Sequence, residues 1–264
     1  MRLRLLLGLL PLLSTPAWAA PRTAGAAIPL PLGDGETLTY HVSWAFLPGV
    51  GEIKIVAGKT TDADGTPQLR VVTTTASRGI AHLLLPFELR AESWFDLRSG
   101  RLMTLNESTE KRDRLSVHTV NFDYLHRVAR YTVADEPPAP RLLALPPGNP
   151  TDLITCLLEA RTWNLRPGET RDALVLFEDD FYQLTVHALG YETITTPLGT
   201  FFTMVLEPRM EKTPPKGMFR HGSTVRVWIS LDPQRLPVRF EVQFKFGTGM
   251  ATLAEYQLPL AARK

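Results

Sequence analysis

The chain has 264 residues, with 29 basic side chains, 27 acidic side chains and one cysteine. Two of the basic residues, Arg2 and Arg4, lie in an N-terminal segment that we expect to be removed, which leaves the two charges balanced. This balance argues against the broad basic surface that binding to nucleic acid or to an anionic membrane uses. A single cysteine, Cys156, excludes an intramolecular disulfide.

Residues 1–19 have the features of a secretory signal peptide. Arg2 and Arg4 give a basic start, residues 5–13 give a short apolar run, and Ala17 and Ala19 flank Trp18 at a cleavage site. The apolar run is shorter than the about 20 residues that span a bilayer. We therefore predict an exported, periplasmic protein whose mature chain begins after Ala19.

The mature chain is expected to be soluble. No apolar run after residue 20 is long enough to form a transmembrane segment. Cys156 lies far from the cleavage site, so it is not the acylated first residue of a lipoprotein.

Residues 20–34 are rich in Ala, Pro and Gly and predict a flexible lead-in. Alternation then begins, with Leu38, Tyr40, Val42 and Trp44 on one face of a predicted half-buried strand. Further strands are predicted around residues 53–57, 69–73, 87–95, 102–108, 115–124 and 128–133. Residues 79–86 read instead as an apolar loop or short helix.

Residues 135–149 contain several prolines, which exclude a central strand. They mark a crossover or a boundary between two halves, 35–134 and 150–257. A helix is predicted at about 150–165, with Asn149 as a possible cap, Pro150 in the first turn and Asp152 at the positive end of the helix dipole. The helix is apolar on more than one side, so we expect it to be buried.

Short strands return after residue 170, and the alternation at Val238, Phe240, Val242 and Phe244 is the cleanest in the chain. Strands at this spacing predict a mainly β, antiparallel fold. We expect residues 35–264 to form one domain, a curved sheet or incomplete β-barrel with the helix packed on its concave side or at its end.

Four pieces of sequence occur in a recognisable order. They are GExLxY at 35–40 followed by Trp44, DLI at 152–154, TPLGTF at 196–201, and VWIS at 227–230 leading to Asp232 and LPV at 236–238. With them the chain resembles, over residues 33–257, the exported bacterial family called domain of unknown function 3108. The resemblance implies an exported, sheet-rich domain and supplies no catalytic residue. Open β half-barrels that carry lipids in the periplasm are a comparison at the level of fold alone.

Motifs for chemistry are absent from the sequence. The six histidines (His41, His82, His118, His126, His187 and His221) have no zinc-like spacing, so we predict neither a metal nor a cofactor. There is no Gly-x-Ser-x-Gly elbow, and Cys156 is expected to pack as a small apolar residue inside the helix. The acidic run at 178–180 is interpreted as a solvated hairpin tip. The remaining option for acid–base catalysis is a pair of carboxylates on the strands, drawn from Glu92, Asp96, Glu107 and Asp123.

Two apolar segments and the tryptophans are the candidate contacts for a ligand or partner. Residues 79–87 supply the first segment, and the loop at 208–222 mixes Met210, Met218 and Phe219 with cations. Each segment can cover an apolar cavity or touch lipid headgroups, or it can simply cap the core. The candidate contact residues are Trp44, Ile80, Leu83, Leu84, Leu85, Phe87, Trp163, Met218 and Phe219, while Trp94 and Trp228 are expected to line or support the same cavity.

The sequence therefore predicts a non-enzymatic protein of the cell envelope. It would bind a lipid or another apolar or amphipathic ligand, or an envelope protein, between the sheet and the helix. One alternative is a hydrolase that acts on envelope glycan or lipid through the strand carboxylates. Another is a structural module that docks through a sheet edge.

Overall fold

The computed structural model describes residues 27–111, 114–134, 139–177 and 179–263, and places them in one 15-stranded sheet. The predicted signal peptide lies outside these residues. The strands are β1 (Thr37–Trp44), β2 (Leu47–Thr61), β3 (Pro67–Ser77), β4 (Phe87–Asp96), β5 (Leu102–Lys111), β6 (Arg114–Asp123), β7 (Val128–Val133), β8 (Arg141–Ala144), β9 (Thr151–Asp152), β10 (Thr170–Phe177), β11 (Asp180–Thr196), β12 (Gly199–Arg209), β13 (Thr224–Ser230), β14 (Pro237–Phe244) and β15 (Gly247–Gln257).

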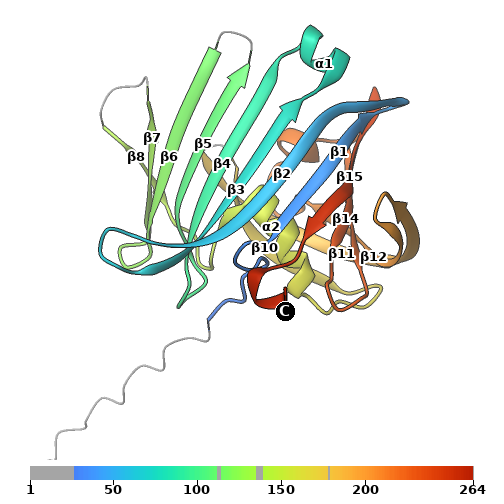
Figure 1. Cartoon of the computed structure of the whole chain (residues 1–264). Coiled ribbons are helices and arrows are strands. Elements are labelled where there is room, and N and C mark those ends of the chain that lie inside the picture. The colour runs from blue at the N-terminus through green and yellow to red at the C-terminus, as the bar shows by residue number, and fades with distance from the viewer. Residues whose placement is uncertain (1–26, 112–113, 135–138, 178, 264) are drawn as a thin grey trace, which may run out of the picture.

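The chain starts in the middle of the sheet. β1 pairs with β2 on one side and with β15 on the other, so the first eight strands lead to one edge and β9 lies at the opposite edge. Every neighbouring pair is antiparallel except β9 and β10. The sheet curves around a concave face without closing its two edges (Figure 1). The predicted mainly antiparallel, incomplete barrel is confirmed.

The proline-rich segment connects the two edges of this sheet. β8 precedes residues 145–150 and β9 follows them, so the prolines fall where the ladder of hydrogen bonds stops. Residues 135–138 of the segment lie outside the described residues. Across the opening, Arg141 of β8 forms an ion pair with Asp179 beside β11. The rings of Phe122 and Phe181 lie beside each other at a tilt of 58°, with 6.4 Å between their centroids.

The predicted helix is shorter than expected. Helix α2 covers Leu153–Glu159 and continues as a 3-10 turn, η1 (Ala160–Thr162). Thr151 and Asp152, predicted as helical, pair instead with β10. The N-cap is therefore Asp152 rather than Asn149: its Oδ1 accepts a hydrogen bond of 2.9 Å from the Thr155 amide. Asn149 instead accepts a hydrogen bond from Arg101.

Helix α2 lies against one end of the concave face (Figure 1). Leu158 is fully buried in the main core, together with residues of both halves of the sheet such as Tyr40 and Val238. Leu157 packs on β11, β12 and β13, and Cys156 packs against β10 and β11. The expectation of a buried helix on the concave side is confirmed.

Smaller elements lie between the strands. The segment at 79–86 contains α1 (Gly79–Leu84), and the loop before β13 contains η2 (Gly217–Phe219), while η3 (Leu260–Ala262) follows β15. The described part of the lead-in is packed, since Leu32 is buried. No helix in the described ranges is both long and apolar enough to cross a bilayer.

Asp152 joins the helix to the sheet, so its replacement is expected to be costly. Its Oδ2 accepts a hydrogen bond of 2.8 Å from the buried Ser93 hydroxyl, in addition to the cap. Asp152→Ala should lower the free energy of unfolding by about 2–4 kcal/mol, because a cap is lost and a buried hydroxyl is left without its acceptor. Urea unfolding measures this. Ser93→Ala, which removes one bond and no cap, should cost less; an equal loss in both variants would contradict the assignment.

Candidate apolar binding site

An apolar pocket opens at the end of the concave face that α2 does not fill. Its volume is about 1030 Å³. Strands β1–β4 and β14 and the segment of α1 form the walls, and none of the lining residues is charged. Thr75 and Ser77 provide the polar lining, and the Ser77 hydroxyl is already bonded to the Phe87 amide. The site therefore offers contact area rather than hydrogen bonds.

Two aromatic rings, Trp44 of β1 and Phe244 of β14, form one wall of the pocket, and Phe246 adjoins them outside the lining. The centroids of Trp44 and Phe244 are 5.8 Å apart, and Phe246, in the β14–β15 turn, stacks on Phe244 at 5.5 Å. The indole lies close to the backbone of β15: a Cβ on Gly247 would stand 3.0 Å from its ring. Glycine is needed here because any side chain would displace the ring, and the position also has φ of +153°.

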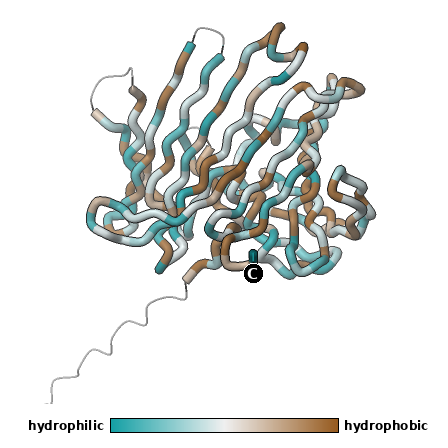
Figure 2. The backbone as a smooth tube through the Cα atoms, in the orientation of Figure 1, coloured by the Kyte–Doolittle hydropathy of each residue, from teal (hydrophilic) through white to brown (hydrophobic). Residues whose placement is uncertain are grey.

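Helix α1 forms the opposite wall. Its six residues include no buried side chain, and Arg78 ties its N-terminal end to β2. The Arg78 amide donates to the carbonyl oxygen of Val50, and the Arg78 guanidinium pairs with Glu52 at 3.0 Å. The tip that carries α1 is strongly hydrophobic (Figure 2). A short helix with apolar side chains and no core of its own is typical of an element that contacts something outside the chain.

Most of the predicted contact residues in segment 79–87 lie together around this pocket, and Trp44 joins them. Trp44, Ile80, Leu84, Leu85 and Phe87 all line the pocket. Leu83 projects from α1 outside the lining and is 81% exposed. The pocket residues that sequence reasoning did not single out include Val42, Leu47 and Phe244. Val42 and Phe244 carried a signal, since each belongs to the apolar face of an alternating strand.

The other predicted contacts lie elsewhere. Trp163 is buried against β11–β13 and borders a separate cleft. Phe219 packs beside Cys156, and Met218 lies next to it in η2. Trp228 is buried, with its indole N–H donating to Glu192, while Trp94 lies under the guanidinium of Arg70. Burial raises the pKa of the Cys156 thiol, which disfavours the reactive thiolate.

The strand carboxylates have local partners. Glu92 accepts hydrogen bonds from Arg70 and Arg90, and these bonds lower the pKa of Glu92 despite its partial burial. Asp123 binds the backbone and ring of His126, and Asp96 accepts backbone amides in the turn after β4. Glu107 faces His118 at 3.6 Å. Within the described residues, no group of three His, Cys, Asp or Glu side chains is arranged to hold a metal ion.

A second, more polar cleft of about 370 Å³ lies beside the C-terminal end of α2. Burial and the nearby Asp152 carboxylate raise the pKa of Glu159 to about 7, against the opposing effect of Arg171. The Arg171 guanidinium stacks on the Trp163 ring at 4.9 Å. The cleft thus contains a carboxyl group that changes charge near neutral pH.

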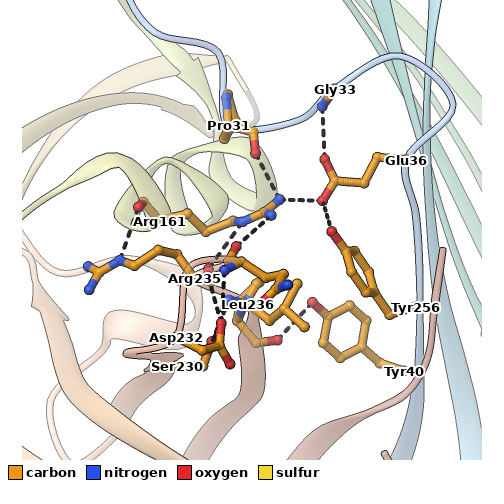
Figure 3. A network of polar contacts seen from close by, with 12 residues as sticks. Pro31, Gly33, Glu36, Tyr40, Arg161, Ser230, Asp232, Arg235, Leu236 and Tyr256 are labelled. Atoms are coloured by element: carbon orange, nitrogen blue, oxygen red, sulfur yellow. Dashed lines mark hydrogen bonds and ion pairs between the residues drawn. The ribbon is translucent and has the colours of Figure 1, made fainter. Parts of the chain in front are cut away.

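A buried ion pair fixes α2 and the lead-in to the sheet (Figure 3). Arg161 and Glu36 are 2.8 Å apart, and their side chains are 10% and 2% exposed. The Tyr256 hydroxyl and the Gly33 amide donate to the Glu36 carboxylate. The Arg161 guanidinium also donates to the carbonyl oxygens of residues 31, 234 and 235. The polar atoms of the buried Glu36 and Arg161 side chains therefore each have a hydrogen-bond partner.

Two of the sequence pieces that carried the family resemblance contribute to this network, whereas Trp44, which follows the first piece, lines the apolar pocket. Glu36 and Tyr40 come from the first piece, and the Tyr40 hydroxyl donates to the carbonyl oxygen of Pro237 in the last. The Ser230 hydroxyl donates to Asp232 and accepts the Leu236 amide. In the DLI piece, Asp152 caps α2. These residues build the scaffold, and the apolar pocket lies apart from them.

The open sheet, its internal helix and the apolar pocket at one end define a barrel-like β-protein. The chain belongs to the family described as protein of unknown function DUF3108, whose model matches residues 39–254. The resemblance noted from the sequence is thereby confirmed. A comparison with curated protein sequences gives no match.

Solved structures support the fold. A beta-barrel-like protein of the domain of unknown function DUF1849 from Brucella abortus is similar at a TM-score of 0.52 and 7% identity, over 87% of this chain and 99% of that one. A candidate lipoprotein from Parabacteroides distasonis has 10% identity over 89% of this chain and 100% of its own, but its TM-score of 0.31 is too low to support an argument.

Removing the cation of the buried network is expected to be strongly destabilising. Arg161→Met leaves the Glu36 carboxylate buried without its partner, which should lower the free energy of unfolding by about 3–5 kcal/mol. Tyr256→Phe removes one hydrogen bond to the same carboxylate and should cost about 1 kcal/mol. Urea unfolding distinguishes the two. If Arg161→Met costs no more than Tyr256→Phe, the network is not what holds α2.

The raised pKa of Glu159 predicts a pH-dependent stability. Since its folded-state pKa of about 7 lies above the ordinary value of 4.5, its contribution is complete below about pH 4.5 and is lost as pH rises through about 7. The loss should reach up to about 2 kcal/mol for this half-buried group. Glu159→Gln should flatten the dependence in urea titrations, whereas Glu255→Gln, at an exposed site, should leave it unchanged.

Proposed function

We propose that this chain is an exported, periplasmic protein of the cell envelope. It binds a lipid or another apolar or amphipathic ligand in the apolar pocket at the end of the concave face (the mouth pocket), without catalysing a reaction. The observation that carries the proposal is the apolar pocket of about 1030 Å³ between α1, β1 and β14. Sites for small molecules have volumes of about 300–1,000 Å³, so this pocket has room for a long acyl chain or a fused-ring ligand.

The lining determines the class of ligand. A buried water needs at least two polar partners, and the lining residues offer mainly aliphatic and aromatic carbon. Water held against such walls is readily displaced by an apolar group, and each square ångström of apolar surface removed from water contributes about 25 cal/mol. An uncharged or weakly polar portion of the ligand therefore belongs inside, with any polar end at the opening.

Export is the other half of the proposal, and residues 1–19 support it. Expression of the full chain in a bacterium with an outer membrane should yield a periplasmic protein whose first residue is Ala20, as intact-mass measurement would show. Recovery in the cytosol with residues 5–13 still attached would contradict the export step and would leave the pocket assignment standing.

Ligand binding is tested by filling the pocket. The wild-type protein should enhance the fluorescence of an apolar naphthylamine dye, and native mass spectrometry of periplasmic material should show a retained lipid. Thr75→Trp, which places an indole among the lining residues, should weaken dye binding by at least about tenfold, equivalent to about 1.4 kcal/mol. Val42→Trp fills the same space from β1 and guards against a fold defect in the first variant.

Thr74→Trp is the matched control. Thr74 neighbours Thr75 on β3, and because successive side chains of a strand point to opposite faces, the added indole lies outside the pocket. Dye binding should then equal that of the wild-type protein. A protein that is purified without lipid and does not bind the dye, or equal binding by both Trp variants, would overturn the proposal.

A further inference from the structure

Large apolar side chains protrude from three neighbouring turns around the mouth pocket. Phe46 in the β1–β2 turn is 89% exposed, Leu83 of α1 is 81% exposed and Phe246 in the β14–β15 turn is 80% exposed. Ile80 and Leu84 of α1 are exposed beside them. Single exposed apolar residues are ordinary, but five of them on adjacent tips, with no core beneath α1, mark a contact surface.

Cations lie next to this apolar rim. Arg220, His221 and Lys245 line a shallow hollow of about 340 Å³ together with Phe246. Within the described part of the chain, neither Arg220 nor Lys245 forms an ion pair. Phe244 lines both this hollow and the apolar pocket, so the two are neighbours. The chain is neutral as a whole once residues 1–19 are removed, which makes this unpaired positive charge local.

We propose that the apolar rim around the opening of the mouth pocket docks on an anionic lipid surface. Phe46, Leu83 and Phe246 enter the interface, and Arg220 and Lys245 contact the headgroups. Aromatic and leucine side chains lower their free energy by leaving water at a bilayer surface, and nearby Lys or Arg adds attraction to anionic lipid. The arrangement positions the pocket opening against the lipids. A soluble anionic ligand would account for the cations but not for apolar side chains that project away from the pocket.

This docking goes beyond the proposed ligand binding, because the three residues that would enter the lipid interface do not line the pocket, although Ile80 and Leu84 belong to both surfaces. Phe46, Leu83 and Phe246 are absent from the lining, whereas Thr75 lies inside and away from the tips. The two activities can therefore be removed separately. A protein that docks without taking up dye, or takes up dye without docking, would identify which of the two inferences has failed.

Cosedimentation with vesicles tests the docking. The full mature chain should bind vesicles containing phosphatidylglycerol more tightly than vesicles of phosphatidylcholine, and added salt should weaken the difference. Phe46→Ser and Leu83→Ser should each reduce binding about tenfold, because less apolar surface leaves water. Lys245→Glu should reduce binding to the anionic vesicles by at least about fivefold, with little effect on phosphatidylcholine.

Matched controls lie away from the mouth. Leu125→Ser removes an equally exposed leucine from the β6–β7 turn, and Lys59→Glu reverses an exposed charge near the other end of β2; both should bind vesicles like the wild-type protein. Thr75→Trp should also dock normally. Near-ultraviolet circular dichroism verifies that each variant is folded.

Three results would overturn the proposal. The first is that the wild-type protein fails to sediment with phosphatidylglycerol vesicles. The second is that the rim variants and the controls bind equally. The third is that light scattering shows a dimer that Phe46→Ser and Leu83→Ser convert to a monomer, since a second copy of the chain would then be what covers the rim.

Discussion

The ion pair between Glu36 and Arg161 is the interaction on which the rest of this structure depends. A strongly curved sheet leaves a concave face that must be covered, and α2 covers one end of it only if the helix is held there. Arg161 does so by joining the helix to the lead-in and to the β13–β14 turn at once. Because both charges are buried, any arrangement that separates them is costly, so the position of the helix is well defined.

The position of α2 also explains where the pocket lies. The helix is short, and its packing residues reach only the strands at its own end of the sheet. At the other end the concave face continues past the core as an apolar wall without a filling element. Scaffold and site are thus separated along the strands: the buried polar network lies at one end, and the apolar pocket lies at the other.

The sequence predicted the features that local pattern controls. Alternation at Leu38 and Tyr40 predicted β1 because one face of that strand is buried, and the apolar face of α2 predicted its burial. The start of the helix was misplaced because Thr151 pairs with a strand that comes later in the chain. Val42 and Phe244 were recognised as an inward face, but alternation cannot distinguish a face covered by side chains from one that borders a cavity. Nor can it pair Glu36 with Arg161, which only the tertiary fold brings together.

The pairing of β1 with β15 has a consequence for how the protein is made. During synthesis the N-terminal strand emerges first, yet one of its edges finds its partner only when residues 247–257 have been made. Throughout that interval an alternating, aromatic-rich edge is available to other chains. The sheet can therefore be completed on both sides of β1 only after almost the whole chain has been made.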